Sequence, residues 1–479
     1  MNSSKYFDHL VVLTAGVGMF LSTLDSGIIN VALPTLSKSF NVDASFISWS
    51  ITLYTLLLTG TIIIFGRLSD KYNRLNIYSI GLTVFLISSI LCGFSNNVVE
   101  LITFRGLQGI GAAMLQGTAT AIITTTIPEH RQGPALGTLS ILLGIGPVLG
   151  PSIGGLLISI GNWRGIFWIN IPFIFIGLIG CLLLKKYIKE PKSVSIHLDI
   201  RGNSLLFVSI FCLLVSLTSW SHHSFFNISV YSNFLIFIIT FCLFIVWELK
   251  TNHPIINLRL FKNISFSSSI FAIFVFGGTT SLGFIIPPYI LEKINHLSSW
   301  QIGLVNLTSP LGLVLISKIT GKLISRVGNT ILMTVGLVIM IASYTSLGLL
   351  QYILNPITIS LLLLIYGIGG GFFLPSNTSA IMGTVSKDMQ GTVGATQRMV
   401  QNIGIAVYTA ITSLFISNQS QTNQLITGAS HAWLFASATL FLSLLPFLLN
   451  YYTISQKLLN IIKASDLQFC ESLAFILFF

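Results

Sequence analysis

The sequence predicts an all-α polytopic membrane protein, and three features support this fold class. Of the 479 residues, 53% are hydrophobic and only 8% are charged, whereas a typical soluble domain has about 25% charged residues. Apolar stretches of about 20 residues, the length that a helix needs to cross the hydrocarbon core, recur along the chain. Basic residues concentrate in alternate connections between these stretches. We therefore expect a chain that folds within a lipid bilayer.

The apolar stretches predict fourteen transmembrane helices. They lie near residues 9–32, 46–66, 76–95, 99–125, 134–160, 166–184, 203–220, 230–248, 265–289, 301–320, 329–350, 356–382, 392–416 and 431–452. The first stretch is too long and too polar for a cleavable signal peptide, so we expect it to remain as a helix. The even number of spans places both termini on the same side of the membrane.

The distribution of basic residues orients the chain. Of the 24 Lys and Arg residues, Lys38, Arg164 and Lys293 fall on one side of the membrane, and Arg105 and Arg398 fall within spans. The others lie in or beside alternate connections on the opposite side. By the positive-inside rule that side and both termini are cytoplasmic. The net charge of +11 therefore reflects topology. We expect a multi-pass protein of the cell membrane that contacts the lipid bilayer and binds no nucleic acid.

Two polar connections divide the chain, one after the sixth span and one after the eighth. We expect a six-helix bundle over residues 1–195, two inserted helices over 196–255, a second six-helix bundle over 256–460 and a tail of unknown role over 461–479. A short repeat supports two related bundles, because Gly66–Asp70 and Gly321–Ser325 follow the second and tenth spans with a similar pattern. Transporters are often built from such repeats, with the substrate site between the halves near the bilayer midplane.

Asp25 is the main candidate for a functional residue. It is the one ionisable residue deep within the first span, and a charge at mid-membrane costs about 3 kcal/mol or more. Arg105 lies in the fourth span at a similar depth, and both residues belong to polar stripes on their helices. An ion pair between them is therefore geometrically possible. We expect the pair to couple transport to protons, and the alternative is a fixed salt bridge that only holds two helices together.

A basic and acidic segment joins the second and third spans. Gly66 permits a close approach of the backbone, and Asp70 is placed to cap the third span. Arg67, Lys71 and Arg74 offer partners to the neighbouring bundle. We expect these five residues to form a latch that closes the cytoplasmic side. The alternative is a segment that only sets topology.

Small residues and prolines mark further positions. In the fifth span, a run of Gly and Pro is typical of a hinge or a tight packing face; it comprises Gly146, Pro147, Gly150, Pro151, Gly154 and Gly155. The pair Pro287–Pro288 is expected to break the ninth span. Polar residues on several spans are candidates for a substrate cavity: Ser22, Gln108, Gln116, Tyr366, Asn377 and Gln401, with Arg398 and Asn402 beside them.

Motifs for other kinds of chemistry are absent from the sequence. It contains no nucleotide-binding P-loop and no His–Glu–His zinc motif. We therefore expect no enzymatic activity, no metal and no cofactor, with the proton as the coupling ion. A membrane receptor is a further alternative, but it would need a folded signalling domain or a long tail.

Together these motifs resemble the Major Facilitator Superfamily, and in particular its fourteen-span drug:proton antiporters of the QacA/EmrB type. The segments that carry the resemblance are Leu24–Pro34, Gly66–Arg74, Leu101–Ala113, Gly144–Gly155, Asn162–Arg164 and Asn170–Pro172. Asn73 departs from the pattern, because Gly is usual at that position. The resemblance covers nearly all of the chain between the first and the last span.

The resemblance implies the major facilitator fold and the export of hydrophobic drugs or amphiphiles against an inward flow of protons. Asp25 would carry the proton, with Arg105 as its partner. Relatives that are specialised for dications carry further acids in the second half, and spans ten to fourteen contain none. The resemblance therefore favours monocationic, zwitterionic or neutral substrates, and we expect a monomer. Export of an endogenous metabolite or a lipid-like molecule remains the alternative.

Overall fold

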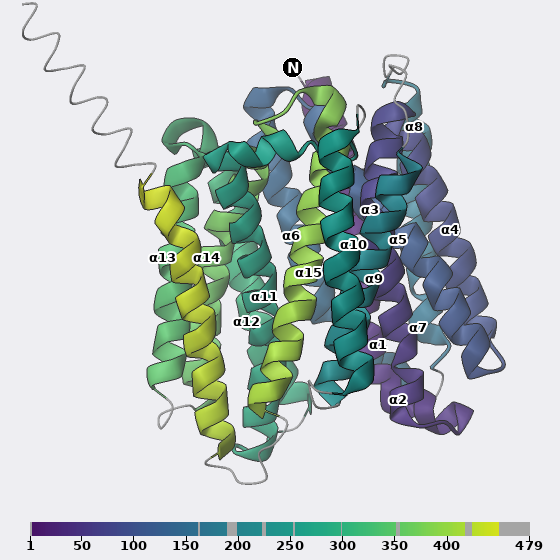
Figure 1. Ribbon diagram of the computed structural model, residues 1–479, viewed down its shortest axis with the longest axis vertical. Coiled ribbons are helices and arrows are strands. Elements are labelled where there is room, and N and C mark those ends of the chain that lie inside the picture. The colour runs from purple at the N-terminus through teal and green to yellow at the C-terminus, as the bar shows by residue number, and fades with distance from the viewer. Residues whose placement is uncertain are drawn as a thin grey trace, which may run out of the picture.

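The computed structural model describes residues 2–160, 163–188, 199–222, 227–251, 254–297, 299–350, 355–416 and 424–449, so the tail at 461–479 lies outside the described residues. All regular elements of the described part are helices (Figure 1). The bounds are α1 Asn2–Phe40, α2 Ala44–Ile47, α3 Trp49–Lys71, α4 Arg74–Phe94, α5 Val98–Thr126, α6 Glu129–Ser159, α7 Gly165–Trp168, α8 Asn170–Lys185, α9 Ile200–His222, α10 Ile228–Lys250, η1 Leu258–Lys262, α11 Ile264–Lys293, α12 Ser299–Val327, α13 Asn329–Leu349, α14 Pro356–Met382, η2 Lys387–Met389 and α15 Gln390–Ile416. The last described helix is Gln424–Leu449.

Twelve helical stretches in the described part are long and apolar enough to cross a membrane. The helices α6 and α15 are not among these twelve, although their lengths of 31 and 27 residues exceed the usual need of about 20. The all-helical fold class is therefore confirmed, while the count of fourteen spans stays a prediction.

Asparagine is the N-cap residue of several helices. Its side-chain oxygen accepts a hydrogen bond from a backbone N–H in the first turn, which would otherwise lack a partner. The capping residues are Asn73 of α4, Asn97 of α5, Asn227 of α10, Asn263 of α11 and Asn355 of α14. At α5 the cap is reciprocal, since Asn97 Oδ1 accepts from the Glu100 N–H and Asn97 Nδ2 donates to Glu100 Oε1. These caps set the helix starts at the membrane surfaces.

The prolines of α11 do not break the helix, which corrects the expectation for Pro287 and Pro288. The helix runs unbroken from Ile264 to Lys293, and α14 likewise continues through Pro375. Proline is tolerated in membrane helices because neighbouring groups and local adjustments satisfy the backbone carbonyls that it leaves without a donor.

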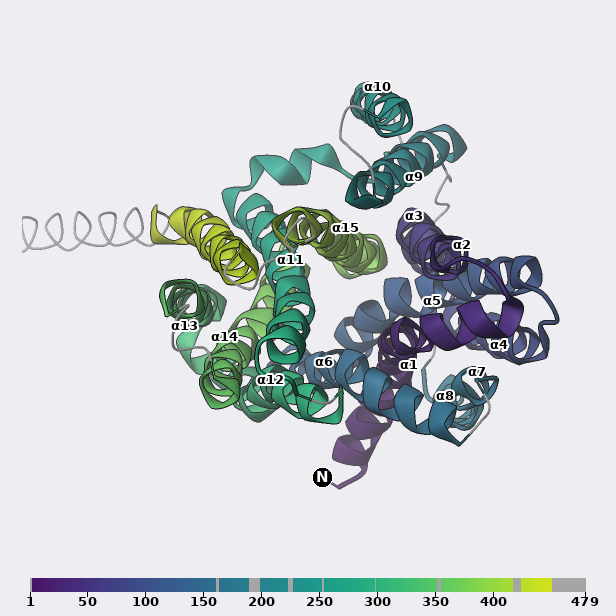
Figure 2. The same ribbon diagram turned by 90° about the horizontal axis from the view of Figure 1, so that it is seen from below.

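The helices pack around separate apolar cores. One core is built from α1, α3, α4, α5, α6 and α8 and includes Tyr54 and Phe85. Another is built from α11 to α15 and the last helix and includes Phe276, Tyr344 and Trp433. The two groups of helices meet along two seams, where α6 packs on α12 and α3 packs on α15 (Figure 2). The helix α9 packs against α3 and α15 from outside, and α10 packs on the outer side of α9 (Figure 2). The predicted domain boundaries stay a prediction.

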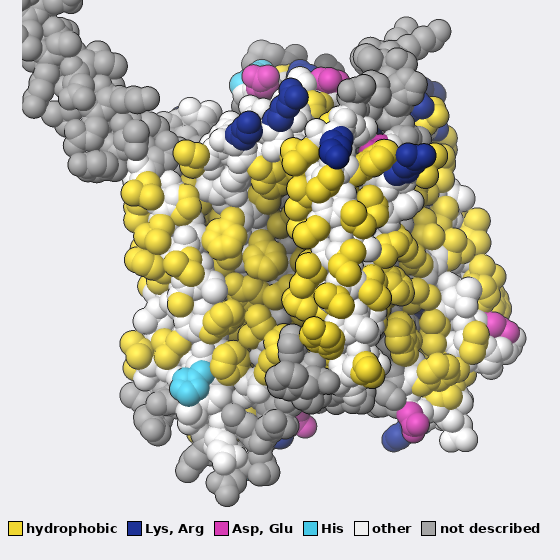
Figure 3. Space-filling model, in the orientation of Figure 1, with side chains coloured by type: hydrophobic (Ala, Val, Ile, Leu, Met, Phe, Trp, Pro, Cys, Tyr) yellow, Lys and Arg dark blue, Asp and Glu magenta, His cyan; other side chains and the backbone are white. Residues whose placement is uncertain are grey.

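Side chains of Lys and Arg gather on one face of the molecule, which we call the basic face (Figure 3). It is the upper face in Figure 1, where α1 begins and where α3 and α12 end. Between this face and the opposite one, the visible surface of the molecule is mainly hydrophobic. This pattern is the one that a lipid bilayer requires, with an apolar belt between two polar faces.

Glycines let α6 approach α1 closely. Gly150 lies against Gly27, and Gly146 and Gly154 lie one turn away on either side, against Leu24 and Ile28. The predicted tight packing face is therefore present. The helix α6 is continuous from Glu129 to Ser159, so a hinge at these positions stays a prediction. Of the other motif residues, Gly155 has nothing within 4 Å of its Cβ position.

We predict that Gly150→Ala destabilises the protein. An added Cβ would lie 2.7 Å from the Gly27 Cα and carbonyl carbon, so the helices must separate, which costs about 1–3 kcal/mol. Thermal unfolding of the purified protein in detergent measures this loss. Gly155→Ala is the matched control, because its methyl group enters open space. Equal unfolding temperatures for the two variants would contradict the packing argument.

Candidate functional site

Asp25 and Arg105 form a buried ion pair between α1 and α5. The Arg105 Nη1 group donates to Asp25 Oδ2, and the exposed fractions of the two side chains are 3% for Asp25 and 0% for Arg105. The ion pair that the depths of the two residues in the sequence allowed is therefore present. The Arg105 guanidinium also lies over the Tyr54 ring, 4.3 Å from its centre, and its Nε donates to the Ser50 carbonyl at 3.3 Å.

Two amides complete the surroundings of the Asp25 carboxylate. Gln108 donates to Asp25 Oδ1 at 3.2 Å and to Ser89 Oγ at 2.8 Å, and its oxygen accepts from Arg105 at 2.6 Å. Asn170 of α8 donates to Asp25 Oδ1 at 3.3 Å. Both carboxylate oxygens thus have donors, which a buried charge requires. A change in the charge of Asp25 would disturb contacts that join α1, α4, α5 and α8.

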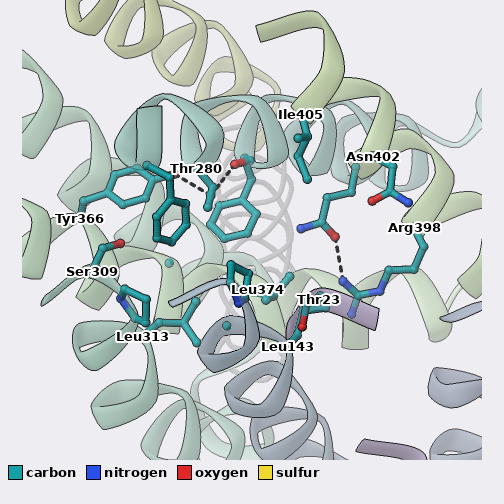
Figure 4. Close-up of a pocket in the computed structure, with 18 of the residues that line it drawn as sticks. Thr23, Leu143, Thr280, Ser309, Leu313, Tyr366, Leu374, Arg398, Asn402 and Ile405 are labelled. Atoms are coloured by element: carbon teal, nitrogen blue, oxygen red, sulfur yellow. Dashed lines mark hydrogen bonds between the residues drawn. The ribbon is translucent and has the colours of Figure 1, made fainter. Parts of the chain in front are cut away.

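A cavity lies between the two groups of helices (Figure 4). Its volume is about 120 Å³, which is below the usual range of about 300–1,000 Å³ for small-molecule sites. The lining consists of Thr23, Gln116, Leu143, Gly144, Pro147, Phe276, Thr280, Phe284, Ser309, Pro310, Leu313, Tyr366, Gly367, Gly370, Leu374, Arg398, Gln401, Asn402 and Ile405. It is mostly apolar and aromatic, with a few polar groups.

Three of the six predicted cavity residues line this cavity, namely Gln116, Tyr366 and Gln401. The other three do not. Ser22 lies behind Gln116, whose amide donates to its hydroxyl at 3.0 Å, and Gln108 belongs to the ion-pair cluster. Asn377 is fully buried within α14, outside the lining. A polar side chain in a span is a poor guide to the cavity because other helices can satisfy it, as they do for Ser22 and Gln108.

The cavity and the ion pair share two helices. Thr23 and Asp25 both belong to α1, and Gln108 and Gln116 both belong to α5. Gln116 follows Gln108 by eight residues, which is about 12 Å along the helix axis. On α5 the ion-pair residues therefore lie farther from the basic face than the cavity does, whereas on α1 Thr23 and Asp25 are only two residues, about 3 Å along the axis, apart. A movement of α1 against α5 would affect both sites.

Asp70 caps a helix in the other group of helices, which corrects the sequence prediction. Its carboxylate accepts hydrogen bonds from Gly391 N at 2.8 Å, Thr392 N at 2.7 Å and Thr392 Oγ1 at 2.8 Å, all in the first turn of α15. The third span, α4, is capped by Asn73 instead. Asp70 still lies within α3 and is thus turned toward α15, whereas Asn73 directly precedes the first turn of α4.

Arg74 and Gly66 complete this contact. Arg74 donates to Asp70 at 2.9 Å and to the Lys387 carbonyl at 2.9 Å. Gly66 lies directly against Gly391 and Ala395 of α15. We call the residues Gly66, Asp70, Arg74, Gly391 and Thr392 the α3–α15 contact. It joins the two groups of helices at the basic face.

Arg67 and Lys71 make contacts outside the α3–α15 contact. Arg67 donates to the Pro254 carbonyl, which follows the inserted helix α10. Lys71 lies over the ring of its neighbour Tyr72, 5.3 Å from its centre. Helical spacing accounts for this arrangement within α3, because Gly66 and Asp70 are four residues apart on one face, whereas residues 67 and 71 lie on a neighbouring face. Arg74 belongs to α4.

The second seam also closes at the basic face. Gly133 of α6 lies against Gly321 of α12, and Gly137 lies against Ser317. Gly321 begins the sequence repeat of the segment that starts at Gly66. The two repeated segments, which begin at Gly66 and Gly321, thus lie at the two seams. In this conformation both seams are closed on the same face of the molecule.

Several contact residues were not assigned roles from the sequence. Asn170 and Tyr54 surround the ion pair, and Thr392 receives Asp70. Asn170 lies in a family-like segment, so that resemblance was an available signal. For Tyr54 and Thr392 the sequence offers no comparable signal, because their roles arise from helices distant in the chain.

Comparisons with known proteins agree on one family. A model described as the Major Facilitator Superfamily matches residues 15–409. The chain is 33% identical over 430 residues to the riboflavin transporter RibZ of Clostridioides difficile, covering 89% of this chain and 92% of that protein. It is 28% identical over 395 residues to the multidrug transporter protein MdtP of Bacillus subtilis, covering 81% and 71%.

Solved structures agree on the fold. The human organic anion transporter MFSD10 superposes with a TM-score of 0.69 at 16% identity, covering 92% of this chain and 99% of that one. The proton:xylose symporter XylE superposes with a TM-score of 0.66 at 15% identity, covering 92% and 95%. At these identities the likeness concerns the fold and not the substrate.

We predict that Asp70→Asn loosens the α3–α15 contact. The amide keeps one acceptor oxygen and loses the charge, which removes charge-assisted hydrogen bonds of roughly 1.5–3 kcal/mol each. Ser69 is fully buried beside this contact, so Ser69→Cys, in a background without the five native cysteines, reports opening through maleimide labelling. Labelling should be faster in Asp70→Asn. The control is Asp388→Asn, at an exposed acid nearby, and equal labelling of both would contradict the contact's role.

We predict that Asp25 and Arg105 are energetically coupled. Either Asp25→Asn or Arg105→Gln leaves one buried charge without its partner, which costs about 3 kcal/mol or more, whereas the double variant removes both charges. The unfolding free energies in detergent should therefore depart from additivity by roughly 0.5–3 kcal/mol. Strict additivity in this double-mutant cycle would mean that the pair does not act as a unit.

Proposed function

This chain belongs to the Major Facilitator Superfamily, and on that premise we propose that it is a proton-coupled antiporter that exports amphiphilic small molecules by alternating access. The observation that carries the proposal is the Asp25 carboxylate, buried deep in a membrane helix and held by Arg105 and two amides. Intramembrane acids are rare and mark proton relays and substrate pathways. No cofactor or metal is part of the proposal, and the proton is the coupling ion.

In the proposed mechanism, proton binding to Asp25 weakens its attraction to Arg105. The helices α1 and α5 can then move against each other, and because both also line the cavity, the movement reaches the substrate. This arrangement links the two sites through rigid helices that share a common shift. The glycine face of α6 against α1 would allow such sliding, with Gly146, Gly150 and Gly154 as its contact points.

The basic face is proposed to be cytoplasmic, with both termini on that side of the cell membrane. The concentration of Lys and Arg on this face supports the orientation. The α3–α15 contact and the α6–α12 glycine contact would then form the cytoplasmic latch. Fourteen crossing helices, with α6 and α15 added to the twelve apolar ones, fit this orientation, and a monomer suffices because the cavity lies within one chain.

The cavity narrows the choice of substrate. Its lining is apolar enough for hydrophobic compounds, and in the described residues it includes Arg398 but no Asp or Glu. A simple monocation would find no counter-charge there. Zwitterionic or neutral compounds are therefore better candidates, and multidrug export is supported by the similarity to the transporter MdtP.

Export of an endogenous metabolite is the second candidate function. It is favoured by the similarity to RibZ, which is named a riboflavin transporter and matches 89% of this chain. A flavin is a large, mostly neutral aromatic molecule, so the apolar cavity would also suit it.

The proposed function is tested by proton flux in vesicles that contain the purified protein. We expect a gradient of norfloxacin, which is a zwitterion, to move protons in the opposite direction, and Asp25→Asn to abolish this flux in a folded protein. Glu292→Gln is the control, because it alters an exposed acid at the end of α11. A response to riboflavin alone would favour the metabolite exporter, and full proton flux in Asp25→Asn would remove Asp25 from the mechanism.

A further inference from the structure

Arg398 is a buried cation with no counter-charge among the described residues. Its exposed fraction is 3%, and it lies in α15 with its side chain at the cavity (Figure 4). In the described part of the chain no carboxylate lies within salt-bridge distance of it, whereas Arg105, Arg74 and Arg131 each have one. The hydrogen-bond partner of Arg398 is neutral, since its Nη1 group donates to Gln401 Oε1 at 2.8 Å.

Hydrogen-bond donors at this part of the cavity lack acceptors. The buried Arg398 Nε and the buried Asn402 Nδ2 have no hydrogen-bond partner. The two residues are four apart on one face of α15, together with Gln401 and Ile405, and all four line the cavity. Leaving a buried donor without an acceptor is costly. A guanidinium is a planar fork that matches a carboxylate or a phosphate with two parallel hydrogen bonds.

The remaining cavity wall suits an aromatic body. Phe276 and Phe284 line it, together with the Tyr366 ring. The Tyr366 hydroxyl already bonds to Thr279 at 2.9 Å and to Thr280 at 3.0 Å, and its ring stacks on Tyr344 with a centroid distance of 4.4 Å. Tyr366 is therefore held in place and offers its ring and not a spare donor. The polar end of a ligand is left to Arg398 and Asn402.

We propose that this cavity recognises an anionic group on its substrate, a carboxylate or a phosphate, through Arg398 and Asn402. The substrate is an aromatic amphiphile with an acidic end, and it is a net anion or a zwitterion. This inference rests on the proposed export function and assigns the substrate class that the same cavity takes. Arg398 is thus a specificity-determining residue, separate from the Asp25 and Arg105 pair.

The test uses two pairs of probes that differ in their acidic group. Norfloxacin carries a carboxylate that its methyl ester lacks, and riboflavin 5′-phosphate carries a phosphate that riboflavin lacks. Binding to the purified full-length protein in detergent is measured by calorimetry. In the wild type, at least one acid should bind roughly 10-fold or more tightly than its partner, because a buried charge pair is formed.

Variants then show where this preference arises. Arg398→Gln should remove the preference for the acid while the neutral or esterified partner still binds, and Arg398→Lys should retain part of it. Arg259→Gln is the matched control, since it removes an exposed Arg from η1 and should keep the full preference. If Arg398→Gln fails to fold, Arg398→Lys and the wild-type comparison of the two probe pairs still decide.

Several outcomes would overturn the inference. They are equal wild-type affinities within both pairs, an acid preference that survives in folded Arg398→Gln, and binding of none of the four probes. Failure of the proposed export function would give a different result. Acid binding that depends on Arg398, without any proton movement in vesicles, would keep the anion site and exclude the antiport.

Discussion

A charge inside the hydrocarbon must find its partner inside the protein, and this constraint orders the structure. Lipid offers no hydrogen bonds, so a buried ion is stabilised by polar groups on another helix. Asp25 forms an ion pair with Arg105 and accepts a hydrogen bond from Asn170, and so joins α5 and α8 to α1. At the basic face, the buried Asp70 likewise accepts hydrogen bonds from the first turn of α15 and so joins the two groups of helices. Arg398 is a buried cation with no carboxylate within salt-bridge distance among the described residues, and its hydrogen-bond partner Gln401 is neutral.

Small residues decide how close these helices come. The glycines of α6 meet α1 through Gly27 and meet α12 through Gly321. At such contacts backbones touch directly and a methyl group would be excluded. Because lipid tails are as apolar as the side chains, tight packing contributes more to helix association here than the burial of apolar area does. The same contacts have few interlocking side chains, which suits surfaces that must slide or separate.

Two charged sites divide the work that transport requires. The Asp25 pair is not part of the cavity lining, and both oxygens of its carboxylate accept hydrogen bonds, so it suits a proton switch that holds a conformation. The cavity has few polar groups and donors to spare, so it suits the binding of a ligand. The helices α1 and α5 connect the two sites. This division lets a proton and a substrate act on the same movement without meeting in space.

The sequence by itself determined the fold class, the approximate spans and the residues Asp25 and Arg105, because hydropathy and isolated charges are local signals. Helical spacing also placed both members of the pair at a similar depth. Only the tertiary structure decided that Asp70 caps α15 and not α4, and that Gln108 serves the ion pair while Asn377 lies outside the cavity lining. It also decided that Arg398 has no acidic partner among the described residues. Each of these depends on which distant helix faces a side chain, and in a bundle of similar apolar helices that choice is made by packing and not by local sequence.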